Sequence, residues 1–202
     1  MKSLQNYITE KILINKNSKI VYNYHPKTKD ELKDIIKQKI ESEGNECDLN
    51  DIDTSNITDM SNLFAYIKFN GDISKWNVSN VTNMEGMFGH SKFNGDLSNW
   101  DVSNVTDMHS MFNWSVFNQD ISNWNVSNVT NMEYMFFGSK FKGDISKWNV
   151  SNVTNMYSMF MGCLLYTSHL EISPLNVERK NIYSILVTLD TSQFDISPLN
   201  FE

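Results

Sequence analysis

The first residues that could do chemistry in this sequence are acids and amides that recur every 24 residues. One column consists of Asp72, Asp96, Asp120 and Asp144, and a second of Asp53, Asn77, Asp101, Asn125 and Asn149. Calcium needs roughly six to eight oxygen ligands that converge on one point, whereas each column supplies one such side chain per repeat. We therefore predict no metal site here, and expect these side chains to accept hydrogen bonds from the backbone of turns.

Catalytic chemistry has no motif to support it. The histidines are His25, His90, His109 and His169, and none pairs with another histidine or a cysteine at the spacing of a zinc site. The chain contains no nucleophile elbow, phosphate-binding loop or dinucleotide-binding motif. We expect a protein that is not an enzyme and has no cofactor.

Aromatic side chains at variable positions are the best candidates for a binding site. The residues one and two places after a recurring phenylalanine differ from repeat to repeat, so the core does not dictate them. Four of them would form a patch on one flank of the molecule: Tyr66, His90, Trp114 and Phe137. Clustered aromatic side chains on a polar surface are typical of protein–protein interfaces. The alternative is that they pack over neighbouring loops.

A second candidate face is polar and almost identical from repeat to repeat. It consists of Lys75, Asn77, Asn99, Asp101, Asn123, Asn125, Lys147 and Asn149. Two interpretations stay open for so uniform a face, which either binds a repetitive ligand such as a glycan or is simply solvated.

The elements that must position these residues follow from the same 24-residue period. Four tryptophans mark it: Trp76, Trp100, Trp124 and Trp148. With degenerate copies at both ends, repeats start at 48, 72, 96, 120, 144, 171 and 195. A single repeat of this length cannot bury its own apolar face, so neighbouring repeats must stack.

Within one repeat, two patterns predict local structure. The alternation of Trp76 and Val78 with polar residues predicts a short strand that points both apolar side chains inward. The apolar spacing from Met84 to Phe88 predicts one helical turn that packs back onto the core.

The chain divides into a cap, residues 1–46, and a seven-repeat region, residues 47–202. In the cap, apolar residues between Leu4 and Leu13 fall at near-helical spacing, and residues 20–24 are β-prone.

A second helix is predicted to begin at Thr28, because Glu31 completes a capping box, and to end at Gly44. Its apolar stripe would cover the first repeat, which would otherwise expose apolar side chains.

The repeat resembles a known family. The stretch FNGDISKWNVSNVTNMEGMF is similar to the tandem "surface protein" repeats of mycoplasmas, other bacteria, some protists and viruses, and to BspA-like leucine-rich repeats. The resemblance covers residues 47–202 and implies binding instead of catalysis. It also implies the fold, an α/β repeat solenoid that is right-handed and leucine-rich-repeat-like, with short parallel strands. The sequence adds an N-terminal α-helical cap to it.

Charge restricts the partners. The net charge is −7, with nine lysines against seven acids in residues 1–46 and eight basic against 17 acidic residues in 47–202. An acidic repeat region repels nucleic acid and anionic membranes, and no stretch is apolar enough to span a bilayer. We expect no nucleic-acid partner and no membrane insertion. Without a signal peptide or a lipid-anchor cysteine, the expected location is the cytoplasm.

These observations predict a non-catalytic protein–protein interaction module whose partner the sequence does not name. One alternative is a surface adhesin that binds host protein or glycan through the second face. Another is a structural protein that forms homo-oligomers through an open C-terminal edge. The resemblance also leaves open a viral or phage origin.

Overall fold

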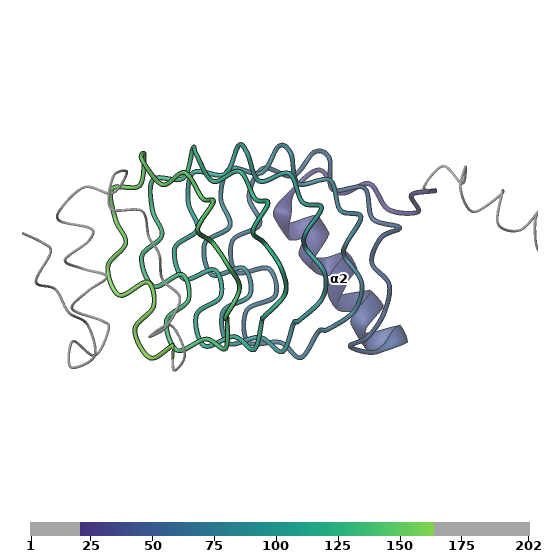
Figure 1. Ribbon diagram of the computed structural model, residues 1–202. Coiled ribbons are helices and arrows are strands. Elements are labelled where there is room, and N and C mark those ends of the chain that lie inside the picture. Colours follow the sequence, from purple (N-terminus) through teal and green to yellow (C-terminus); the bar gives the residue numbers. More distant parts are fainter. Residues whose placement is uncertain (1–20, 164–202) are drawn as a thin grey trace, which may run out of the picture.

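The computed structural model describes residues 21–163. In this part of the chain a single helix, α2 (Lys29–Glu43), is followed by successive coils of 24 residues. Figure 1 shows the coils side by side along one axis, with α2 lying across the N-terminal end of the stack. The helix predicted between Leu4 and Leu13 and the repeats predicted to start at 171 and 195 lie outside the described residues.

Neighbouring coils are joined by isolated parallel bridges. Most of them share one register: Asp59 pairs with Asn83, Asn83 with Asp107, Asp107 with Asn131, and Asn131 with Asn155. No β-strand occurs between residues 21 and 163. The prediction of an α/β, right-handed β-solenoid with short parallel strands was therefore wrong, although the 24-residue period does set the spacing of the coils.

The backbone around the tryptophans explains why no strand forms there. The Trp76 N–H donates to the carbonyl of Ile73 at 3.1 Å, and the Val81 N–H donates to the carbonyl of Val78 at 2.9 Å. Both bonds close tight turns within one coil. They use donors that a ladder between strands would need.

The segment from Met84 to His90 carries much of the pairing between coils instead. Its alternate N–H groups, from Met84, Gly86, Phe88 and His90, donate to carbonyls of the following coil over 2.7–2.9 Å. Between them, the Met87 N–H closes a turn to the Met84 carbonyl at 3.2 Å. The helical turn predicted here is thus a run of turns whose polar backbone is shared with the next coil.

Aromatic rings fill the interior as continuous columns. One column consists of Phe64, Phe88, Phe112, Phe136 and Phe160, with ring centroids 5.5–5.6 Å apart. In a second column the centroids of Trp76 and Trp100 are 6.5 Å apart, and the Trp76 Nε1–H donates to the Leu49 carbonyl of the preceding coil at 2.9 Å. Because the stacking partners belong to adjacent coils, one coil alone has no core.

Helix α2 forms as its sequence predicts. Thr28 Oγ1 accepts from the Glu31 N–H at 3.2 Å, and Gly44, at φ 92°, donates to the Ile40 carbonyl at 2.9 Å to end the helix. Leu32 and Ile36 are buried in the core of the first coil. The prediction of a capped helix from Thr28 to Gly44 is confirmed.

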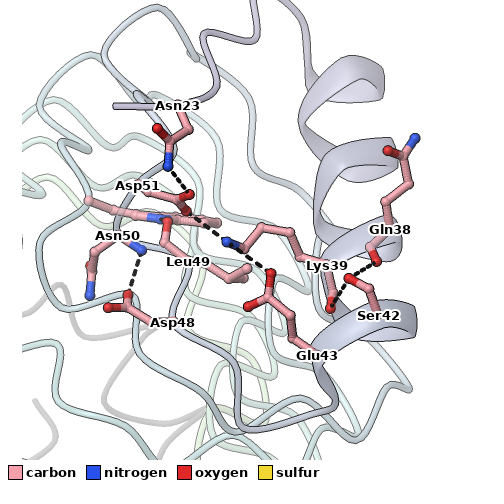
Figure 2. A network of polar contacts seen from close by, with 10 residues as sticks. Asn23, Gln38, Lys39, Ser42, Glu43, Asp48, Leu49, Asn50 and Asp51 are labelled. Carbon is pink, nitrogen blue, oxygen red and sulfur yellow. Dashed lines mark hydrogen bonds and ion pairs between the residues drawn. The ribbon is translucent and has the colours of Figure 1, made fainter. Parts of the chain in front are cut away.

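A buried lysine fastens α2 to the first coil (Figure 2). Lys39 donates to Asp51 at 3.0 Å and pairs with Glu43 at 3.5 Å, while Asn23 donates to the other oxygen of Asp51 at 2.9 Å. Burial acts to lower the pKa of Lys39, but the hydrogen bond and attraction to Asp51 outweigh it, so the pKa lies above its ordinary value. Burial likewise acts to raise the pKa of Asp51, and the bonds from Asn23 and Lys39 hold it below its usual value.

Candidate functional site

The four residues of the predicted aromatic patch lie on one flank of the stack, and we call them the aromatic ridge: Tyr66, His90, Trp114 and Phe137. Hydrogen bonds between coils align their backbones. The Tyr66 N–H donates to the Gly89 carbonyl at 2.9 Å, and the Trp114 N–H donates to the Phe137 carbonyl at 2.7 Å. Equivalent positions of successive coils therefore follow one another along the stack.

The rings of the aromatic ridge contact one another in order. Tyr66 stacks on His90 with centroids 4.5 Å apart, and His90 on Trp114 at 6.4 Å. Phe137 meets Trp114 edge-on at 5.7 Å. Tyr66 is 75% exposed and Trp114 55%, so the rings are ordered by one another and remain open to solvent. The structure brings together all four residues, and their role in binding stays a prediction.

Three ridge residues occupy a backbone conformation that favours glycine. The φ angles are 62° at Tyr66, 54° at His90 and 51° at Trp114, and in the next two coils the same position holds Gly138 and Gly162. For a residue with a Cβ this left-handed region costs about 1–2 kcal/mol. Large rings therefore occupy a position at which glycine would satisfy the fold.

Gly138 makes room for the Trp114 indole. A Cβ added at Gly138 would lie 2.7 Å from Trp114 Cδ2 and 2.8 Å from its Cε3. The indole thus lies over the backbone of the next coil and ends the run of stacked rings.

Sequence reasoning missed further aromatic residues beside the ridge. Tyr134 meets Phe137 edge-on at 5.4 Å and Tyr157 at 5.5 Å, and His109 contacts Tyr134 at 6.2 Å. Tyr157 is 53% exposed. These residues precede the recurring phenylalanine instead of following it, and their departure from the repeat was the signal that could have identified them.

The second candidate face is exposed along its whole length, at Lys75, Asn77, Asn99, Asp101, Asn123, Asn125, Lys147 and Asn149. Half of these side chains are engaged in turns. Asn77 Oδ1 accepts from the Ser79 N–H at 3.1 Å, and Asp101 Oδ1 from the Ser103 N–H at 3.1 Å, and Asn125 and Asn149 repeat the contact. The bonds from the Ser103 hydroxyl and N–H hold the pKa of Asp101 below its usual value.

The recurring acids have the same role. Asp72 Oδ1 accepts from the Ser74 N–H at 2.9 Å, and Asp96, Asp120 and Asp144 make the equivalent bond. The interpretation of these columns as turn-forming side chains is confirmed. Within residues 21–163, no group of three or more histidines, cysteines and acids is placed to hold a metal ion.

The two cysteines are buried, unpaired thiols. Burial raises the pKa of both Cys47 and Cys163. Cys163 packs against Ser139 with the sulfur 3.3 Å from the hydroxyl oxygen. Such thiols are less nucleophilic at neutral pH than exposed ones.

Comparison with known families supplies a match to the family described as Mycoplasma protein of unknown function, DUF285, over residues 31–140 and 91–187. The chain belongs to the DUF285 family. Among curated proteins and solved structures, none matches the chain.

The first DUF285 match, residues 31–140, includes most of α2 and the whole aromatic ridge. It confirms the expected likeness to mycoplasma-type repeats, and it does not extend to leucine-rich repeats. No helix in the described part of the chain is both long and apolar enough to cross a membrane. The cytoplasmic location and the viral or phage origin stay predictions.

Proposed function

We propose that this DUF285 protein is a non-catalytic repeat protein that binds a partner protein through its aromatic ridge. One observation carries the proposal: Tyr66, His90 and Trp114 present exposed rings from left-handed backbone in three successive coils. Unfavourable backbone that the surrounding structure holds in place is typical of functional sites.

The chemistry of the ridge suits a protein partner. Tyrosine and tryptophan supply large contact areas with few rotatable bonds. Stacking between Tyr66, His90 and Trp114 already restricts their rings, so binding would lose little side-chain entropy. An apolar side chain of the partner would pack against the exposed ring edges, where burial of aromatic area supplies most of the binding free energy.

The second face offers less to a ligand. The side-chain oxygens of Asn77 and Asp101 already accept hydrogen bonds from their own coils. A glycan would compete with these turns for the same acceptors, which favours the ridge as the binding surface.

The proposal is tested by affinity capture with the full chain from a cell lysate, followed by mass spectrometry. The ridge variant is Trp114→Gly, which places at position 114 the residue that positions 138 and 162 already carry. The matched control is Lys75→Ala on the second face, an exposed position outside the ridge.

A protein captured by the wild-type chain and by Lys75→Ala, and lost with Trp114→Gly, supports the ridge as the binding site. Circular dichroism of each variant establishes that it is folded. A partner that Trp114→Gly retains and Lys75→Ala loses would reject the ridge and favour the adhesin alternative.

A further inference from the structure

The chain stretches that carry the aromatic ridge contain lysines and no acid. They are residues 62–71, 86–95, 110–119 and 134–143, which hold Lys68, Lys92, Lys140 and Lys142 and neither aspartate nor glutamate. An acid contacts these stretches at Asn70, whose Nδ2 donates to the Glu46 carboxylate of the preceding coil at 3.3 Å. The protein as a whole has a net charge of −7. These stretches therefore carry a net positive charge within an otherwise acidic repeat region, and we call their four lysines the lysine column.

Three members of the lysine column, Lys68, Lys92 and Lys140, share one register of the repeat, and Lys142 lies two residues further along the chain. Lys68 follows Tyr66 by two residues, and Lys92 follows His90 in the same way. Both members of each pair are exposed, while the residue between them is partly or fully buried. In each pair the ring and the lysine are therefore both open to solvent and only two residues apart along the chain.

Within residues 21–163 the lysine column forms no ion pair. The ion pairs in this part of the chain involve Lys29, Lys37 and Lys39 of α2 and the side chains of His25 and His109. On α2, by contrast, Lys39 contacts both Asp51 and Glu43. These four exposed lysines thus have no ion-pair partner among the described residues, and their ammonium groups can pair with carboxylates of another molecule.

We infer that the partner contacts the ridge with an acidic peptide segment, in which carboxylates alternate with apolar side chains. This inference rests on the proposed function and specifies its partner. The apolar side chains would pack on Trp114 and Tyr66, while the carboxylates pair with Lys68, Lys92 and Lys140. Complementary charge of this kind sets specificity and the rate of association.

The same flank is a poor match for other anionic surfaces. Single-stranded nucleic acid binds by stacking bases on open ring faces, but His90 has a ring on either side, at 4.5 Å and 6.4 Å, and one face of Tyr66 is covered by His90. Each lysine near an anionic membrane favours binding by about 1 kcal/mol. Against this, the net charge of −7 opposes the approach of a membrane or a nucleic acid, since both are extended phosphate-rich surfaces.

The test is a selection of random 12-residue peptides displayed on phage against the immobilised full chain. Enriched peptides are then synthesised, and their affinities are measured by fluorescence anisotropy. Three proteins are compared with the wild type: Trp114→Gly, the charge-reversed K68E/K92E/K140E, and the control K75E/K147E, which reverses lysines of the second face. Phosphatidylserine vesicles and a 20-nucleotide single-stranded DNA are measured in parallel.

The expected peptides are acidic and contain aromatic or aliphatic residues. The variant K68E/K92E/K140E should bind these peptides at least about tenfold more weakly than the wild type. Raised salt should weaken their binding to the wild type several-fold, since exposed ion pairs are screened. The control K75E/K147E should bind like the wild type. Thermal melts followed by circular dichroism verify that all variants are folded.

Other outcomes separate the two proposals. Neutral or basic peptides that Trp114→Gly loses would overturn the acidic partner and leave the ridge as a binding site. Peptides whose affinity does not depend on Trp114 would reject the ridge itself. No peptide enrichment, or binding to vesicles or DNA in its place, would overturn the inference of an acidic peptide segment.

Discussion

Replacing Gly138 with alanine tests how the ridge is held. Gly138 has φ 63°, and its new Cβ would lie 2.7 Å from Trp114 Cδ2. The left-handed backbone should cost about 1–2 kcal/mol once a Cβ is present. The displaced indole would also lose its contacts with His90 and Phe137, about 0.5 kcal/mol each for a side chain this exposed. We expect the free energy of unfolding to fall by about 2–3 kcal/mol.

The assay is urea unfolding of the wild type, Gly138→Ala, Trp114→Gly and the double variant. Without the indole, Gly138→Ala should cost only about 1–2 kcal/mol, which leaves a coupling free energy of about 1 kcal/mol between the two positions. Gly162→Ala is the matched control, because its φ is 74° and, among the described residues, its Cβ would meet only the backbone of Gly138 at 3.5 Å. Its cost should not depend on Trp114. If Gly138→Ala costs the same with and without the indole, Trp114 does not lie over Gly138 and the reasoning is refuted.

Three further predictions concern the core, the cap and the ridge. Phe112→Ala should lower the free energy of unfolding by about 3–5 kcal/mol in urea, because its ring is fully buried between neighbouring coils; a loss under about 1 kcal/mol would contradict the column. Asp51→Asn should lower the free energy of unfolding at pH 7, and this loss relative to the wild type should shrink as pH falls below about 4. The reason is that the lowered pKa of Asp51 gives stability that is present above the unfolded pKa and lost as the folded carboxyl is protonated. A loss that stays constant down to about pH 2 would reject the Lys39–Asp51 bond as its source. Trp114→Ala should weaken partner binding by at least about 2 kcal/mol and lower Tm by only about 2–4 °C. Both quantities are measured by calorimetry. A much larger fall in Tm would make Trp114 a core residue.

Much of the architecture could be predicted from the period. The apolar positions of the repeat, such as Ile73, Trp76 and Phe88, are buried, apart from Ile145 and Val150 in the last described coil, which are partly buried. Residues that recur at the coil spacing face the shared interior. The caps of α2 were readable at Thr28 and Gly44, since capping depends on local chemistry that a short sequence carries in full.

The strands could not be predicted correctly because alternation has two meanings. Inward-facing Trp76 and Val78 fit a strand, and they fit a series of tight turns equally well. The deciding signal is the acid or amide placed two residues before a serine, as in Asp72 with Ser74 and Asn77 with Ser79. Each such pair forms a turn that removes an N–H from any ladder between coils, so the local hydrogen bond prevails over the strand pattern.

The positions of the ridge residues were predictable, whereas their backbone was not. Variation among Tyr66, His90 and Trp114 showed that the core does not choose these side chains. The glycines at 138 and 162 in the same column were the available sign of a left-handed position. Contacts such as that between Trp114 and Phe137 depend on the distance between coils, which one repeat does not contain.

Stability alone does not account for the rings of the ridge. Each ring contact contributes about 0.5–1.5 kcal/mol, while the left-handed backbone costs a residue with a Cβ about 1–2 kcal/mol that glycine avoids. The two terms nearly cancel at His90, which lies between Tyr66 and Trp114, and the balance is less favourable for Tyr66, which has a ring neighbour on one side only. Glycine at Tyr66 should therefore leave the free energy of unfolding within about 1 kcal/mol of the wild type. The fold could omit the Tyr66 side chain at this small cost, and the side chain is 75% exposed, two residues from Lys68, which forms no ion pair within residues 21–163. It is best explained by what it contacts outside the chain.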